Sequence, residues 1–193
     1  IFYKEEFYSE LTFHYWFWKN ELKKFIHRDD LWIGFCQKRR FWLQNKKNVE
    51  INFENINDYL LKEIPEEWKN YDAIICEPIR VEVNKISKLI KKGWRNLLKD
   101  PTIFFDKRKH SIKLHFDMYH GYGLLDKAIK KMDDKNKFKF QNFVNYSNIF
   151  NPHIMLIAKP KILDLWFHDL FEWLFECEKI FKFDNLKDYE TKR

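Results

Sequence analysis

Three short apolar runs limit the folds that are open to this chain. They are LWIGFC at residues 31–36, AIIC at residues 73–76 and HIMLIA at residues 153–158. Each has the length of a buried strand, and longer stretches of helical spacing separate them. Short strands that alternate with helices predict an α/β domain.

The helical stretches are marked by apolar residues three and four positions apart. The first is expected to run from Glu10 to about Lys24, with Ser9 as its cap. Further helices are expected at residues 59–63, 83–98, 111–120, 124–132 and 161–181. Residues 136–150 show alternating apolar positions instead. The last helix is rich in aromatic residues, and its excess rings are expected to meet a further segment or a membrane surface.

The composition predicts one compact domain over residues 1–193. The chain has 193 residues, enough for a real core, and we find no repeat or linker in it. Its 20 Phe, 9 Tyr and 8 Trp against only 4 Gly indicate an interior filled by large rings. No apolar run approaches the roughly 18–20 residues needed to span a bilayer.

The net charge and the cysteine spacing limit the binding partners and the cellular compartment that we expect. A net charge of +7 favours anionic partners such as nucleotide sugars, nucleic acid or anionic lipid, although it is equally compatible with a background property. The three cysteines lie far apart without a CxxC pair, which suits a reducing cytoplasm and argues against a cysteine zinc site.

Common catalytic and cofactor motifs are missing from the sequence. It contains no GxGxxG, no phosphate-binding loop of the GxxxxGK type, no HExxH and no GxSxG. His110, His115 and His120 are five residues apart, a spacing that does not put them on one helix face. We therefore predict no metal site from these histidines.

The segment QKRR at residues 37–40 directly follows the first apolar run. Ligands of open α/β sheets bind beyond the carboxyl ends of strands, and a guanidinium group suits a phosphate in two-point contact. Arg39 and Arg40 are therefore candidates for an anion site, with a solvated strand end as the alternative. Asp29 and Asp30 precede the same run and either cap it or reach a cleft.

Five blocks of the sequence resemble a bacterial domain family that is associated with capsular polysaccharide and lipopolysaccharide glycosyltransferases. The blocks are ELTFHYWFWKN (10–20), WIGFCQKRR (32–40), YDAIICEP (71–78), Tyr119-His120, and NPHIMLIAK with FEWLFECEKIF near the end. They resemble the family signatures ELT..YW.WKN, G.CHYRR, a YDII.P-like strand, YH, and NMFIM followed by WLF. The order is the same, and the blocks cover most of the chain.

The resemblance implies a glycosyltransferase with a GT-A-like sheet, which binds a nucleotide sugar and is flanked by helices. The expected donor is a UDP-sugar, the acceptor is a glycan or lipid-linked glycan, and the expected location is the cytoplasm at the inner face of the membrane. The cofactor stays open, with Mn²⁺ or Mg²⁺ as the candidate. Family members begin with a THK-like strand that this chain lacks, so we expect the chain to be part of a longer domain.

Roles for individual residues follow from the resemblance and the chemistry together. Arg39, Arg40 and Lys19 are expected to hold the donor diphosphate. Glu10 or Asp30 is expected to act as general base, with Asp30 alternatively binding the cation. The expected substrate contacts are Gln37, Tyr15, His120 and Asn151.

Two departures from the family pattern keep other functions open. Gln37 and Lys38 stand where the family has His and Tyr, and glutamine cannot take up a proton at neutral pH. A non-catalytic member that binds a partner protein is one alternative. The other is a basic nucleic-acid-binding module that uses the Lys/Arg clusters at residues 38–40, 91–95 and 107–109.

Overall fold

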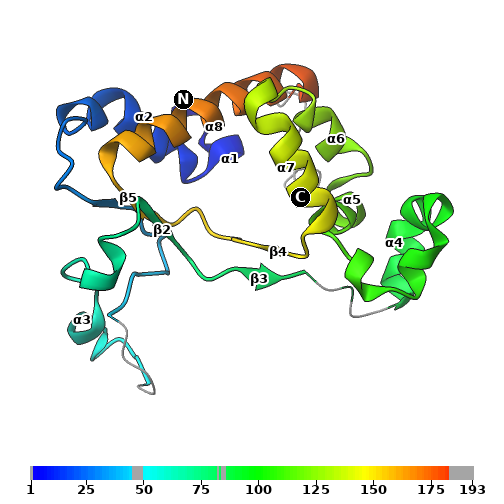
Figure 1. Cartoon of the computed structure of the whole chain (residues 1–193), viewed down its shortest axis with the longest axis horizontal. Helices are drawn as coiled ribbons and strands as arrows, with labels where there is room; N and C mark the ends of the chain where they lie inside the picture. The colour runs from blue at the N-terminus through cyan, green and yellow to red at the C-terminus, as the bar shows by residue number, and fades with distance from the viewer. Residues whose placement is uncertain (1, 45–49, 82, 84–85, 183–193) are drawn as a thin grey trace. The chain divides into compact units, whose positions relative to one another are not determined.

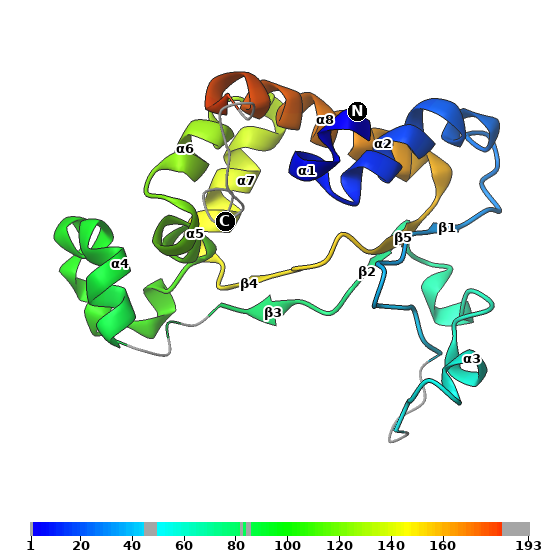
Figure 2. The ribbon, with the colours of Figure 1, turned by 180° about the vertical axis from the view of Figure 1, so that it is seen from behind.

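The computed structural model describes residues 2–44, 50–81, 83 and 86–182. The chain divides into two compact units (Figures 1 and 2). The first unit comprises residues 1–76 and 153–167, and the second comprises residues 77–152 and 168–193. We describe each unit by itself, and the single domain over residues 1–193 stays a prediction.

The first unit contains a three-stranded sheet in the order β1-β5-β2. Its strands are β1 (Ile33–Gly34), β2 (Ala73–Ile75) and β5 (Leu156–Ala158). Both outer strands pair antiparallel with β5, with Gly34 opposite Ile157 on one side and Ile75 opposite Leu156 on the other. Because each is antiparallel to the same strand, β1 and β2 run in the same direction and end at one edge of the sheet.

Helices cover one face of this sheet. They are α1 (Glu5–Tyr8), α2 (Leu11–Asn20) and the first part of α8 (Pro160–Phe181), with α3 (Ile56–Tyr59) on a separate loop. Helix α2 lies beside α8 in both views (Figures 1 and 2), and the Trp18 indole donates to Asp164 Oδ1 at 2.7 Å. Fully buried Phe167 packs against Phe35 with ring centroids 5.8 Å apart, so aromatic rings form this core as the composition predicts.

The second unit is mainly helical. Its helices and strands are β3 (Ile79–Arg80), α4 (Ile86–Lys99), α5 (Ile112–His120), α6 (Leu124–Ile129), α7 (Asp134–Tyr146) and β4 (Ile149–Phe150), together with the 3₁₀ turns η4 (Pro101–Phe104) and η5 (Lys107–Lys109). Strands β3 and β4 pair antiparallel. Leu89, Leu114 and Met118 belong to one core cluster between α4 and α5. Gly93 of α4 faces α5 here, and a Cβ added to it would lie 3.4 Å from Met118 Cγ and Sδ.

The α/β class is confirmed as a mixture of helices and small antiparallel sheets. All three predicted strands exist, but each is shorter than its apolar run: β1 keeps only Ile33 and Gly34 of residues 31–36. The helices predicted at residues 83–98, 111–120, 124–132 and 161–181 correspond to α4, α5, α6 and α8. The first predicted helix ends earlier, at Asn20, and a 3₁₀ turn over Leu22–Lys24 follows it.

Two local predictions were wrong, and one stretch without a predicted element is helical. Ser9 does not cap α2 with its side chain; it has a φ of 48°, and Glu10 occupies the N-cap position. The helix expected at residues 59–63 lies at Ile56–Tyr59, because residues 59–61 pair with residues 42–44 instead. The alternating stretch after residue 136 belongs to helix α7, which begins where the Asp133 carboxylate accepts from the backbone N–H of Asn136 at 3.0 Å.

Candidate ligand-binding site

The QKRR segment forms a tight turn in the first unit. Gln37 and Arg40 face each other in an isolated antiparallel bridge, and the Arg40 N–H donates to the Gln37 carbonyl at 3.1 Å. Lys38 and Arg39 form the tip, and both side chains are exposed. Within the described residues, neither tip cation forms a salt bridge, so the tip presents uncompensated positive charge.

The Gln37 amide connects this turn to helix α2. Its Nε2 donates to Glu10 Oε2 at 2.7 Å, and its Oε1 lies 3.4 Å from Arg40 Nη1. The structure therefore brings together Glu10, Gln37 and Arg40, three of the predicted site residues. A half-buried carboxylate is held at the base of the turn by a neutral amide, not by a cation.

His14 lies one helical turn after Glu10 and points into the aromatic core. Its ring centroid is 4.3 Å from that of Phe35 and 5.9 Å from that of Phe167. Burial lowers the pKa of His14 to about 4, so the imidazole is neutral at pH 7. Its buried Nδ1 has no hydrogen-bond partner among the described residues. His14 was not among the predicted site residues, although its spacing from Glu10 places both on one helix face.

A cavity of about 400 Å³ lies on the side of β1 that carries Trp32, Gly34 and Cys36. Its remaining lining residues are Phe41, Trp42, Leu60, Leu61, Lys62, Glu63, Ile64 and Ile157. Because Cys36 and Phe41 immediately flank the QKRR turn in the chain, the turn stands at the edge of this cavity. Cavities of this size that combine rings with a few polar groups are typical of small-molecule sites.

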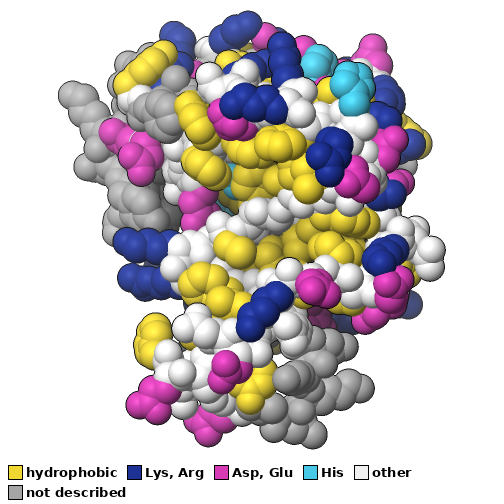
Figure 3. Space-filling model, turned by 90° about the vertical axis from the view of Figure 1, so that its left-hand side faces the viewer, with side chains coloured by type: hydrophobic (Ala, Val, Ile, Leu, Met, Phe, Trp, Pro, Cys, Tyr) yellow, Lys and Arg dark blue, Asp and Glu magenta, His cyan; other side chains and the backbone are white. Residues whose placement is uncertain are grey.

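Two contacts fix the aromatic wall of the cavity. The Trp42 indole N–H donates to the Phe35 carbonyl at 2.9 Å, and the Trp42 ring meets Trp68 edge-on at 6.4 Å. The Leu61 N–H donates to the Trp42 carbonyl at 2.9 Å, which attaches the other wall. Hydrophobic side chains gather across the middle of the face in Figure 3, which views the side where α2, β5 and α3 lie in Figure 1.

The acidic pair before β1 is engaged elsewhere. Asp30 accepts from Arg28 Nε at 2.8 Å and from Arg28 Nη2 at 2.7 Å, and this contact lowers the pKa of Asp30 to about 2. Asp29 pairs with Lys161 at 2.8 Å. A carboxylate with so low a pKa is a weak proton acceptor at neutral pH, so the pairing favours Glu10 over Asp30 as general base.

Lys19 and Tyr15 lie toward the other end of α2. The Lys19 ammonium stands 3.3 Å from the Trp18 ring centroid and 5.6 Å from that of Tyr15. Nine helical residues separate Lys19 from Glu10, which corresponds to roughly 13 Å along the axis. Neither side chain contacts the turn in any described interaction.

His120 and Asn151 belong to the second unit. The exposed His120 ring packs on Phe116 at 4.8 Å, and Asn151 lies between β4 and Pro152. Their proposed roles as sugar contacts stay predictions. Among the described residues, no group of three or more His, Cys, Asp or Glu side chains could hold a metal ion, the three spaced histidines included.

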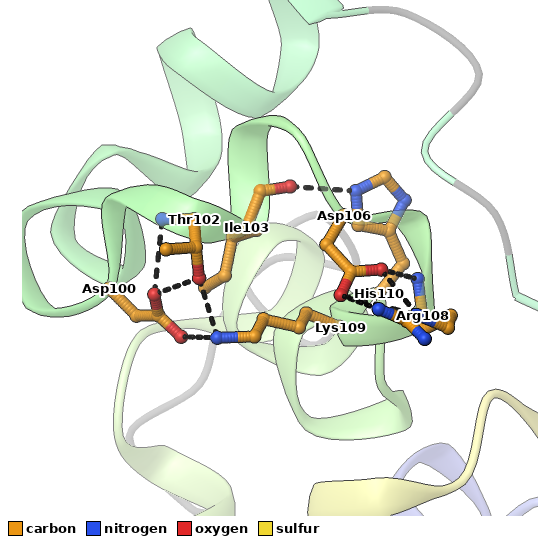
Figure 4. A network of polar contacts seen from close by, with 7 residues as sticks. All are labelled: Asp100, Thr102, Ile103, Asp106, Arg108, Lys109 and His110. Carbon is orange, nitrogen blue, oxygen red and sulfur yellow. Dashed lines mark hydrogen bonds and ion pairs between the residues drawn. The ribbon is translucent and has the colours of Figure 1, made fainter.

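The basic segment 107–109 of the second unit lies in a polar network (Figure 4). Asp106 accepts from Arg108 Nε and Nη2, both at 2.9 Å, and Asp100 accepts from Lys109 at 2.7 Å. His110 is buried, and its Nε2 lies 3.2 Å from the Ile103 carbonyl. Asp100 and Asp106 cap two consecutive 3₁₀ turns and pair with the neighbouring cations, so the charges of Arg108 and Lys109 have a structural explanation.

Comparison with known proteins gives one match. The model of a family described as "Domain of unknown function (DUF4422)" matches residues 1–193. No curated protein and no solved structure matches the chain. Among the described residues, no helix has both the length and the apolar character to cross a membrane.

Proposed function

The chain belongs to the DUF4422 family, and we propose that it is a glycosyltransferase domain. It would transfer a sugar from a nucleotide-sugar donor, a UDP-sugar in the first instance, to a growing bacterial surface glycan at the inner face of the membrane. The observation that carries this proposal is the exposed QKRR turn at the edge of an aromatic cavity.

The cavity and the turn supply complementary halves of a donor site. A nucleotide sugar combines flat or ring-shaped parts with a diphosphate. Trp32, Phe41 and Trp42 offer surfaces on which a base or a sugar can stack. Arg39 and Arg40 offer guanidinium groups for the diphosphate and for the charge that grows on it as the bond to the sugar breaks.

In the transfer step, the acceptor hydroxyl oxygen attacks the anomeric carbon of the donor. The new carbon–oxygen bond forms as the anomeric carbon–phosphate oxygen bond breaks, and the nucleoside diphosphate leaves with that electron pair. The hydroxyl proton passes to the Glu10 carboxylate, which the Gln37 amide orients at 2.7 Å. Within this proposal, Glu10 is the catalytic residue and Gln37 is a positioning residue.

The proposal extends the fold as well. We take the β1-β5-β2 sheet to be part of a GT-A-like sheet, whose ligand edge is the edge at which β1 and β2 both end. The role of Mn²⁺ or Mg²⁺ stays open. Asp30, the cation ligand expected from the sequence, precedes β1 and so lies at the opposite end of that strand from this edge. Metal dependence is therefore one arm of the test.

The test is to incubate the chain with a panel of nucleotide sugars, with and without Mn²⁺. Turnover is measured as the release of the nucleoside diphosphate. We expect one donor to be consumed and Glu10→Gln to slow its turnover by about 100-fold or more. Asp30→Asn is the matched control and should change the rate little. If Asp30→Asn abolishes turnover while Glu10→Gln does not, the assignment of the base is wrong. If no donor binds or reacts, the proposed function fails.

A further inference from the structure

Helix α4 in the second unit has an exposed apolar stripe separate from its core face. Ile86, Ile90, Trp94 and Leu98 recur every four residues, which places them along one side of the helix. Their side chains are 56%, 52%, 49% and 74% exposed, respectively. The core face is formed by other positions, such as Leu89, so the stripe has no described partner within the unit.

Apart from Ser87, the other exposed residues of α4 are all basic. The helix carries five cations and no acidic residue: Lys88, Lys91, Lys92, Arg95 and Lys99. At 100° per residue, these positions follow one another on the side of the helix next to the stripe. Within the described residues, none of the five forms a salt bridge. An apolar band is thus bordered by uncompensated positive charge.

Aromatic rings of the neighbouring segment lie under these cations. The Lys92 ammonium stands 4.7 Å from the Tyr119 ring centroid, and Arg95 and Lys99 stand 5.5 Å and 5.2 Å from that of Tyr122. Tyrosine and tryptophan are favoured where one side of a ring is apolar and the other is hydrated. The border of the stripe therefore has the chemistry of a water–lipid boundary.

We propose that α4 docks the protein on an anionic lipid surface. The stripe from Ile86 to Leu98 enters the boundary between headgroups and acyl chains, and the cations contact the lipid phosphates and carboxylates. This inference adds a membrane-binding surface to the proposed function. It rests on α4 and its neighbours alone and does not depend on a donor site.

The positive charge of the chain argues against a second copy of the chain as the partner of the stripe. A second copy of the chain would bring two sets of five cations together, at a net charge of +7 per copy. The rings of α8 do not compete for the membrane role, because no Trp or Phe of α8 is among the large exposed hydrophobic residues described. Phe167 and Phe171 of α8 are buried and its other rings are half-buried, and the expected contact of this helix with a further segment or a membrane surface stays a prediction.

The test is co-sedimentation of the chain with phosphatidylcholine vesicles that contain either none or about 30% phosphatidylserine. We expect binding only to the anionic vesicles, and weaker binding at high salt. Leu98→Ser should weaken it about tenfold through lost apolar contact. Lys91→Gln/Arg95→Gln should weaken it by about fivefold per removed charge.

Helix α7 provides matched controls. Phe138→Ser removes an apolar side chain that is 70% exposed, and Lys135→Gln/Lys139→Gln removes two exposed cations. Both variants should bind the vesicles like the parent chain. A cooperatively melting protein that ignores anionic vesicles would overturn the proposal. The proposal would also be overturned if Leu98→Ser changed the mass of the protein in solution from dimer to monomer but left vesicle binding unchanged. It would be overturned as well if the α4 cations bound an oligonucleotide and Leu98→Ser did not weaken that binding.

Discussion

Two basic segments of similar composition have opposite surroundings. In the second unit, Arg108 and Lys109 are held by Asp106 and Asp100, so their charges are compensated within the fold (Figure 4). In the first unit, the turn that includes Arg39 and Arg40 contacts Glu10 only through the Gln37 amide. A cluster of Lys and Arg therefore indicates a binding site only when the acidic residues around it are known. Cations that pair with carboxylates contribute to the fold, and unpaired cations are available to bind a ligand.

This comparison predicts that removing a paired charge of the second unit costs stability. Asp117 is the strongest case, because its side chain is fully buried, pairs with Lys113 at 2.8 Å and accepts from the Gly123 N–H at 3.0 Å. Asp117→Ala should lower the free energy of unfolding by about 3 kcal/mol, since the Gly123 N–H loses its acceptor and Lys113 keeps only its pairing with Asp126 at 3.0 Å. Urea unfolding measures this change.

The matched variant in the first unit is Glu10→Ala, which removes a carboxylate that accepts a hydrogen bond from the neutral Gln37 amide. Its loss of stability should be about 1 kcal/mol. Equal losses for Asp117→Ala and Glu10→Ala would remove the distinction between the two regions.

A second prediction concerns the buried histidine beside the turn. The pKa of His14 is lowered to about 4 in the folded chain from its ordinary 6.5, so the unfolded chain binds the proton more tightly. The stability that this shift contributes is complete above pH 6.5 and is lost as the pH falls toward 4, by about 3 kcal/mol in total. Urea midpoints across this range measure the slope.

His14→Phe keeps an aromatic ring and removes the titrating group, so its stability should vary less between pH 6.5 and 4. His27→Asn, at an exposed position, is the control and should keep the parent slope. A parent slope in His14→Phe would show that another group is responsible.

A smaller effect is expected from the cap of the second 3₁₀ turn. Asp106 accepts from the Arg108 backbone N–H at 3.0 Å, and its salt bridge to the Arg108 guanidinium lies at the surface. Because a surface pair contributes little, the lost cap should dominate, and Asp106→Ala should lower Tm by about 3 °C. Differential scanning calorimetry measures this shift, and Asp134→Ala in the first turn of α7 is a control for general charge loss.

The sequence predicted the elements better than their contacts. Apolar runs located the three strands of the first unit but not β3 and β4, and helical spacing located α4, α5, α6 and α8. The pattern failed at α7, where Phe138 is exposed and half-buried Phe140 and buried Val144 form the inner face. Alternation and helical spacing overlap in so short a stretch, and only the packing of the unit decides between them.

The site was predictable in part for a similar reason. Arg28 lies two residues before Asp30, so their pairing was visible in the sequence as a local alternative to catalysis. The contact of Glu10 with Gln37 joins residues 27 positions apart, and no periodicity reveals it. The cavity walls from residues 60–64 were missed because they come from a loop with no motif.

The most direct test of the central claim is isothermal titration calorimetry of UDP, GDP and CMP with three proteins. These are the parent chain, Arg39→Ala/Arg40→Ala and Arg108→Ala/Lys109→Ala, so that both variants lose two charges. We predict that one nucleotide binds the parent chain, that the first variant weakens it by about 100-fold, and that the second leaves it unchanged. Equal weakening by both variants, or no binding of any nucleotide to the folded parent chain, would contradict the claim that unpaired cations mark the ligand site.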